Sequence, residues 1–201
     1  MSSLALPRLN GTALYGLAAL VALFELGVTW VSLHPHVPAD YRAYYLDQTT
    51  TCLNEPVSGA YSNGAELPTV SGYERLVATI RVCGFEGPVG DGLHLVGESG
   101  RLRFKMLGPQ HYLRLMLQMV AVDFTAPKGQ DIDVVVNGTP VGSAHVSTGS
   151  PQRFSFAIPD AVLSVDGLVD VELKAPDAVK VDPTDSNTRK RSIKLSAVRV
   201  G

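Results

Sequence analysis

The chain has few of the residue patterns that catalysis or cofactor binding usually requires. Its 201 residues include two cysteines, one tryptophan and five histidines that are spread along the sequence. No GxSxG, HExxH, P-loop or GxGxxG pattern occurs, which leaves the corresponding hydrolase, zinc-protease and nucleotide-binding classes without support. The cysteines form no CxxC pair, which argues against redox or zinc chemistry. We therefore expect no enzymatic activity, no cofactor and no metal site.

An excess of charge of one sign is also lacking. There are 17 lysines and arginines against 19 acidic residues, for a net charge of −2. A balance of this kind argues against a nucleic-acid partner, and no charged tail is present. No repeat of 20 to 50 residues is visible. With 45% hydrophobic residues, the chain is long enough for one domain with its own core.

One long apolar run lies near the N-terminus, from Ala13 to Leu33. Because roughly 20 helical residues cross a hydrocarbon core of about 30 Å, this run predicts a transmembrane helix. The predicted organisation is a short cytoplasmic N-terminus (1–12), the transmembrane helix (13–33), a stalk (34–50) and an extracytoplasmic domain (51–201).

Charges beside the apolar run predict its orientation. Arg8 and the N-terminal amine precede it, whereas Arg42 on the other side is accompanied by Asp40 and Asp47. Positive residues favour the cytoplasmic side, so we expect a single-pass protein of the inner (cytoplasmic) membrane with a periplasmic C-terminal domain.

A cleaved signal peptide is the alternative to an anchor. Val37, Pro38 and Ala39 include small residues of the kind found at a signal-peptidase site. The apolar run is longer than the 7 to 15 residues typical of a signal peptide, and it contains Trp30 near its end. These features favour an uncleaved anchor.

Glu25 is an acidic residue in the middle of the apolar run. Charged residues inside membrane spans usually face protein, and the small residues Ala18 and Ala22 permit close helix packing. The sequence therefore predicts that Ala18, Ala22 and Glu25 pack against a membrane protein partner or complex. A protonated Glu25, or one whose carboxyl extends towards the interface, is the alternative.

Cys52 and Cys83 both belong to the predicted extracytoplasmic domain. A disulfide between them would close a loop of about 30 residues and stabilise the domain by a few kcal/mol. Two buried free thiols are the alternative that the sequence leaves open.

The rest of the chain shows the alternation and turn residues of a mainly β domain. Short alternating runs are divided by turn residues, and no amphipathic crossover helices lie between them. Asn137 and Gly138 predict a type I′ hairpin turn. The pattern predicts an antiparallel, jelly-roll-like β-sandwich. Residues 52–75 are expected to be mostly loop, and strands are expected at 76–82, 101–106, 112–123, 132–136, 141–146, 153–158, 168–174 and 192–200.

From about Gly84 onwards the chain resembles a known domain family. The similar segments are GFEGPVGDGLHLVGESGRLRFKM, LRLMLQMVAV, DVVVNGTPVG, RFSFAIP and NTRKRSIKLSAVRV. Together they resemble the extracytoplasmic C-terminal β-sandwich of bacterial membrane glycosyltransferases and phosphoglycerol-transferase-like proteins. The resemblance implies a role in glycan assembly, although the multi-pass catalytic portion of that family is absent from this chain. Of the family's Asp-x-Arg-x-Leu-Gly-like ending, only an arginine is matched.

The most polar loop of the domain is the predicted ligand-binding site. Asp182, Asp185, Asn187 and Arg189 offer oxygen ligands for Ca²⁺ or hydrogen bonds for sugar hydroxyls. A solvated loop whose side chains bond their own backbone is the alternative. Asp91 and Glu98 are expected beside a hairpin turn around His94. They could act as an acid and a base, but the sequence favours solvated loop residues. Tyr61, Tyr73, Phe85 and Tyr112 are candidate platforms for sugar stacking, and Phe154 and Phe156 are expected in the core.

These observations predict a non-catalytic, membrane-anchored accessory protein whose sandwich binds a glycan or a partner of glycan assembly. The alternative is a structural subunit of a larger membrane complex, held through its transmembrane helix and its sandwich.

Overall fold

The computed structural model describes residues 11–33, 41, 45, 57–108, 110–122, 129–184 and 189–201. The chain divides into two compact units, Met1–Pro38 and Ala39–Gly201. The first contains helix α1 (Gly11–Leu33), which buries none of its 23 residues. Its mean hydropathy reaches 1.8, so it is long and apolar enough to cross a membrane. An apolar helix over the predicted residues is thus confirmed, and its crossing of a membrane stays a prediction. Ala18, Ala22 and Glu25 lie on its exposed surface.

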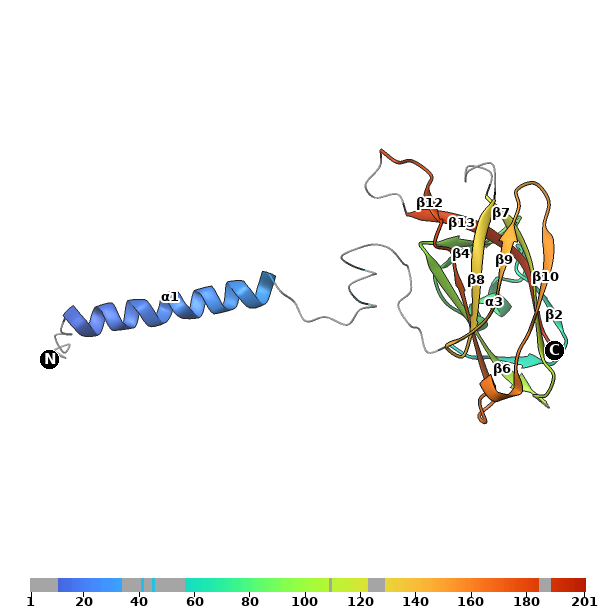
Figure 1. Cartoon of the computed structure of the whole chain (residues 1–201), viewed down its shortest axis with the longest axis horizontal. Helices are drawn as coiled ribbons and strands as arrows, with labels where there is room; N and C mark the ends of the chain where they lie inside the picture. Colours follow the sequence, from blue (N-terminus) through green and yellow to red (C-terminus); the bar gives the residue numbers. More distant parts are fainter. Residues whose placement is uncertain are drawn as a thin grey trace, which may run out of the picture. The chain divides into compact units, whose positions relative to one another are not determined.

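The second unit is a sandwich of two β-sheets (Figure 1). One sheet has the order β1-β6-β11-β8-β9, with β3 beside β6. The other has the order β10-β7-β13-β5-β4, with β2 and β12 beside β13. The strands are β1 (Gly59–Ser62), β2 (Glu66–Pro68), β3 (Arg81–Cys83), β4 (Phe85–Val89), β5 (Gly92–Val96), β6 (Ser99–Leu107), β7 (Arg114–Ala121), β8 (Gln130–Val136), β9 (Thr139–Val146), β10 (Gln152–Ala157), β11 (Leu168–Lys174), β12 (Val179–Lys180) and β13 (Lys190–Val200).

The predicted β-sandwich is confirmed. From β6 to β13 the chain passes repeatedly from one sheet to the other, as a jelly roll does. All strand pairs are antiparallel except β1 with β6, which run parallel. Alternation in the sequence explains the two-layer packing, because β6 buries every second residue and leaves the residues between them half-buried, or exposed at its end.

The core lies between the two sheets. Phe104 of β6 is fully buried and contacts the ring of Tyr61 edge-on, with 5.1 Å between ring centroids. Leu117 of β7 and Leu195 of β13 face it from the second sheet's inner side and are also buried. Each such side chain contributes roughly 1.5 to 3 kcal/mol on burial. As expected, Phe156 is buried in this core and Phe154 packs against it.

The predicted hairpin at Asn137 and Gly138 is confirmed. Both residues have positive φ, 47° and 79°, as a type I′ turn requires. The turn joins β8 to β9, which pair in antiparallel register. The predicted strands at 101–106, 153–158, 168–174 and 192–200 are likewise present, with small differences at their ends.

The strand predicted at 76–82 is wrong. Its first part is helix α3 (Glu74–Ile80), and only β3 at its end is extended. The buried residues Val77 and Ile80 are three positions apart, which is helical spacing that a short apolar run does not distinguish from alternation.

Two local details refine or correct the sequence predictions. The described residues 57–75 are mostly loop, as expected, but they also contain β1 and β2, short strands that pair with β6 and β13. The turn expected around His94 lies earlier, between β4 and β5, and His94 itself is in β5 opposite Lys194.

Candidate functional site at the loop end of the sandwich

Two loops meet at one end of the sandwich, at the bottom of Figure 1. Residues 107–113 run from β6 into β7, and residues 158–167 run from β10 through the short helix η1 (Asp160–Val162) towards β11. The N–H of Ile158 donates to the carbonyl of Leu113 at 2.9 Å. The N–H of Tyr112 donates to Oδ1 of Asp160 at 3.0 Å. We call these two loops together the loop site.

The second of these loops is held by bonds within itself. Gly167 N–H donates to the carbonyl of Ser164 at 3.0 Å, and Leu168 N–H donates to Oδ1 of Asp166 at 3.1 Å. The Ser164 hydroxyl also donates to Asp166, and together with the Leu168 N–H it lowers the pKa of Asp166. Because the loop satisfies its own polar groups, it forms a fixed support for the site.

A side chain from the β8–β9 hairpin adds a further connection. The amide nitrogen of Asn137 donates to the carbonyls of Val162 at 2.9 Å and Leu168 at 3.2 Å. Its oxygen accepts from the N–H of Asp170 at 2.8 Å. The loop site is therefore tied to both β8 and β11.

A recess of about 230 Å³ opens between the two loops. This volume lies below the roughly 300 to 1,000 Å³ of pockets that enclose a drug-sized ligand, so the recess suits one part of a larger ligand. Nδ1 of His111 lies 3.5 Å from Oδ2 of Asp160. Oε1 of Gln110 is buried without a hydrogen-bond partner in the described part of the chain. The residues that line the recess are Gln110, His111, Asp160, Leu163, Ser164 and Val165.

Tyr112 stands beside this recess with an unusual backbone. Its φ is +57°, and its side chain is 89% exposed. Positive φ is strained for a bulky residue, at a cost of order 1 to 3 kcal/mol, and such strain gathers at functional sites. The Tyr112 ring is not packed in the core, so its burial does not offset this strain. Core packing therefore does not explain why a tyrosine occupies this position.

The loop site combines groups suited to a polyhydroxylated ligand. The Tyr112 ring offers an apolar face with a polar tip. The Gln110 amide, His111 imidazole, Asp160 carboxylate and Ser164 hydroxyl offer both donors and acceptors. Val165, which is fully exposed, adds a second apolar group at the rim. Such a set of groups would suit a ligand that has both a hydroxyl edge and a C–H face.

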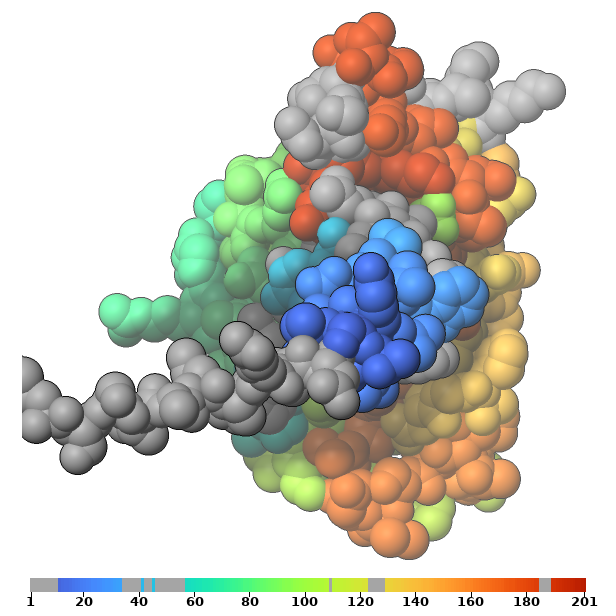
Figure 2. All heavy atoms as spheres, turned by 90° about the vertical axis from the view of Figure 1, so that its left-hand side faces the viewer, coloured from blue at the N-terminus to red at the C-terminus, as the bar shows by residue number. Residues whose placement is uncertain are grey.

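The described residues of the ligand loop predicted from sequence, Asp182 and Arg189, lie at the opposite end of the domain. β12 pairs with the first residues of β13, whereas the loop site adjoins the last residues of that strand. Figure 2 shows the same separation, with the orange-red segment near 180 at the top and the orange segment near 160 at the bottom. Oδ1 of Asp182 accepts from the N–H and hydroxyl of Thr184, at 2.8 and 2.6 Å.

The remaining members of that predicted loop are only partly described. Arg189 is half-buried just before β13. Asp185 and Asn187 lie outside the described residues. The bond from Asp182 to Thr184 is that of a self-capped turn, and ligand binding by the loop stays a prediction.

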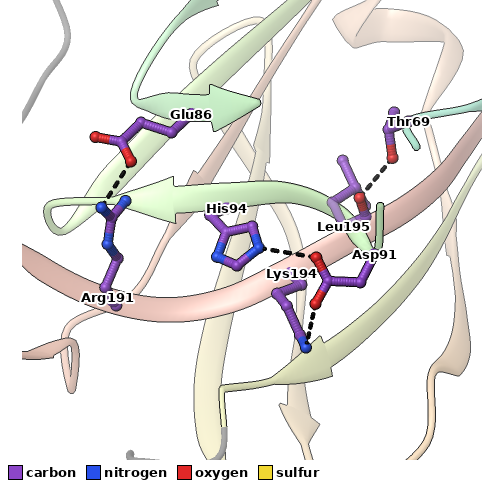
Figure 3. A network of polar contacts seen from close by, with 7 residues as sticks. All are labelled: Thr69, Glu86, Asp91, His94, Arg191, Lys194 and Leu195. Carbon is purple, nitrogen blue, oxygen red and sulfur yellow. Dashed lines mark hydrogen bonds and ion pairs between the residues drawn. The ribbon is translucent and has the colours of Figure 1, made fainter. Parts of the chain in front are cut away.

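Asp91 and Glu98 belong to separate ion pairs rather than to one acid and base pair. Figure 3 shows Asp91 between Lys194 and His94, at 2.7 and 3.1 Å. The bonds from Lys194 and His94 lower the pKa of Asp91 to about 2. Glu98 pairs instead with Lys190. In the same view the Thr69 hydroxyl donates to the carbonyl of Leu195.

The other residues singled out from sequence have different locations. Tyr61 and Phe85 belong to the core, and Tyr73 precedes α3 with 41% exposure, so Tyr112 is the most exposed of the four aromatic candidates. Cys83 of β3 is disulfide-bonded. The chain's other cysteine, Cys52, lies outside the described residues, so their pairing stays a prediction.

The recess residues Gln110, His111 and Asp160 were not identified from sequence. The turn-forming pair Pro159 and Asp160 was the available indication of a structured loop. Nothing local shows that this loop meets His111, because the contact depends on the pairing of β10 with β7.

No family model matches the chain, and no curated protein matches it in sequence. Among solved structures it is similar to the CBM36-1 domain of a multidomain xylanase from the hindgut metagenome of Trinervitermes trinervoides (13% identity, 69% of this chain and 97% of that chain, TM-score 0.40). It is also similar to a family 6 carbohydrate-binding module from Clostridium cellulolyticum, solved with xylose (12% identity, 70% and 99%, TM-score 0.41). A family 35 carbohydrate-binding module from an environmental isolate is a third (15% identity, 76% and 87%, TM-score 0.37). Similarities of this size assign no ligand, so the function has to be argued from the loop site itself.

Proposed function

We propose that the chain is a non-catalytic accessory protein that binds a glycan through the loop site. The observation that carries the proposal is Tyr112, a bulky residue kept exposed in a strained conformation beside a recess with polar side chains. An exposed ring stacks on the C–H face of a sugar, while Gln110, His111 and Asp160 bond its hydroxyls. The resemblance to domains of glycan-assembling membrane enzymes supports a role in glycan assembly.

The proposal includes anchoring of the domain by α1 in the inner membrane. The length and hydropathy of α1 support a transmembrane helix, and the charges around it support a periplasmic domain. Fusion of alkaline phosphatase to the C-terminus should give an active reporter, because that enzyme needs the periplasm. Retention of an N-terminal tag in the membrane fraction distinguishes an anchor from a cleaved signal peptide.

Glycan binding is tested with the full chain in detergent on an array of neutral and acidic oligosaccharides. We expect Tyr112→Asn to reduce binding of the best neutral ligand by about tenfold or more, since it removes the stacking ring. Tyr73→Asn is the matched control, because it removes another exposed tyrosine, which precedes α3 and is not part of the loop site. Equal losses in both variants, or no binding by the wild type, would overturn the proposal.

A second candidate function is that of a structural subunit of a membrane complex. The observation that favours it is Glu25 on an apolar helix, where a carboxyl is costly unless it faces protein. Purification from native membranes should then give a fixed partner that Glu25→Leu releases. Tyr112→Asn should leave such a complex intact, which separates the two functions.

A further inference from the structure

The outer surface of the second sheet carries a shallow depression. It shares no lining residue with the recess of the loop site. Its volume is about 120 Å³, and it is lined by three consecutive residues from each of β7, β10 and β13 together with Glu66 of β2. The inward residues of these strands fill the core, so the side chains that alternate with them face outward.

The strand registers place the outward residues in two rows across the sheet. In one row Ser155, Met116 and Arg199 are neighbours, with Glu66 beyond Arg199. In the next row Arg153 lies opposite Gln118. Cross-strand neighbours have Cβ atoms about 4.5 to 5.5 Å apart, so these side chains lie within reach of one ligand.

Arg153 and Arg199 line the depression, and Arg114 adjoins it, because its Nε donates to the lining residue Ser155. Arg114, Arg153 and Arg199 are exposed, and none of them makes a salt bridge with a residue that the structure describes. Elsewhere in the domain, by contrast, Arg103 pairs with Asp170 at 2.6 Å and Arg191 pairs with Glu86 at 2.6 Å.

The guanidinium groups of Arg114 and Arg153 donate hydrogen bonds to uncharged side chains. Nε of Arg114 donates to the Ser155 hydroxyl at 3.0 Å, and Nε of Arg153 donates to Oε1 of Gln118 at 3.5 Å. In each case the bond uses Nε, which leaves the two terminal amino groups as donors. A planar fork of donors fits a carboxylate in a bidentate way.

Charge and shape together indicate the ligand. Two arginines and a single carboxylate, Glu66, line the depression, and a third arginine, Arg114, adjoins it, in a chain whose net charge is −2. Met116 and Ala197 add apolar side chains to the lining of the depression. The surface is open and runs across several strands, which suits an extended chain more than an enclosed small molecule.

We propose that this surface, the arginine face, is a second binding site that takes the carboxylated residues of an acidic glycan. The inference rests on the proposed glycan binding but uses none of the residues of the loop site. The carboxylate of a uronic acid bonds the guanidinium groups, while its ring lies on Met116 and Ala197. Neutral parts of the same glycan engage Tyr112.

The probe is a galacturonate oligomer, and its fully methyl-esterified form is the uncharged control. Binding to the full chain in detergent is measured by calorimetry. We expect the acid form to bind at least about tenfold more tightly than the ester, and we expect higher ionic strength to reduce this difference. Equal affinity for the two forms, or no binding of the acid form, would overturn the inference.

The variants then locate the site. Arg153→Gln combined with Arg199→Gln should remove the preference for the acid form, while Arg75→Gln, the same change on exposed α3, should not. Replacing both residues by lysine should restore only part of the preference, since a lysine lacks the planar fork. Thermal unfolding checks that each variant is folded.

Two further results keep the inference separate from the proposed function. Tyr112→Asn should weaken binding of neutral oligosaccharides and leave the preference for acid over ester in place. If instead Tyr112→Asn has no effect but the arginine variants do, the loop site is wrong and the arginine face stands. If polyglutamate binds as tightly as the galacturonate oligomer, the arginine face is a general anion surface and the inference fails.

Discussion

Asp160 accepts a hydrogen bond from the backbone N–H of Tyr112 at 3.0 Å, and this bond fastens one loop of the candidate site to the other. Asp160→Ala leaves that N–H without its partner, at a cost of about 1 kcal/mol. We expect a fall in Tm of a few degrees together with loss of glycan binding. Asp160→Asn keeps an acceptor oxygen and should retain most of the stability. A similar loss of stability in both variants would contradict this assignment.

The tyrosine at position 112 should contribute to ligand binding but not to the free energy of unfolding. Asparagine adopts positive φ more readily than tyrosine does, and the Tyr112 ring buries little area. We therefore expect Tyr112→Asn to leave the free energy of unfolding unchanged or to raise it by up to about 1 kcal/mol. Urea denaturation measures this change. A clear loss of stability would show that the ring supports the fold.

Acid should remove the stabilisation that comes from Asp91. Bonds from Lys194 and His94 lower the pKa of this carboxyl from 3.8 to about 2 in the folded state. Since the folded pKa is the lower one, the contribution is complete above about pH 4 and is lost as the pH falls towards about 2. Asp91 is more than half exposed, so screening limits the effect to about 1 kcal/mol or less.

Asp91→Asn should accordingly lower Tm at neutral pH by up to about 4 °C and have no effect near pH 2. Asp177→Asn, at an exposed carboxylate without an ion pair among the described residues, is the control. Parallel Tm curves for wild type and Asp91→Asn across this pH range would show that the network contributes nothing.

Gly100 is required by packing rather than by backbone conformation. A Cβ atom at this position would lie 2.5 Å from Cδ1 of Leu95 and 2.6 Å from Cε2 of Phe85. Gly100→Ala should cost about 1 to 3 kcal/mol, because two buried side chains must move. Gly90→Ala meets nothing within 4 Å and should be neutral or slightly stabilising. Denaturant midpoints compare the two variants, and equal midpoints would be inconsistent with tight packing at Gly100.

The disulfide of Cys83 should contribute strongly to stability. If its partner is Cys52, the bond closes a loop of about 30 residues, and reduction should cost roughly 3 to 4 kcal/mol. Thermal unfolding with and without a reducing agent measures this cost. Cys52→Ser and Cys83→Ser should each match the reduced wild type, and a difference between the two variants would exclude this pairing.

The fold was largely predictable because its determinants are local. Alternation along β6 and β13 and the positive-φ pair Asn137 and Gly138 specify strands and a hairpin without reference to the rest of the chain. The prediction failed where pairing decides the outcome. β1 consists of four residues of ordinary loop composition that form a strand only beside β6, and the pair Val77 and Ile80 fits either a strand or a helix.

The candidate site was predictable only in part. Tyr112 was among the aromatic candidates, but its exposure depends on a backbone φ that the sequence does not display. His111 and Asp160 are 49 positions apart and meet because β10 pairs with β7. The three arginines share a face only through the registers of three strands, so no local pattern identifies them.

Asn137 has consequences for the engineering of this domain. Its backbone forms the hairpin turn, while its side chain reaches the loop site through Val162 and Leu168. A Gly-Gly or Asp-Gly turn would keep the hairpin and still release the loop, since neither supplies an amide donor. Turn sequences that are interchangeable in an isolated hairpin are therefore not interchangeable in this domain. The side chain of Asn137 makes the conformation of a distant loop depend on which residues form the turn.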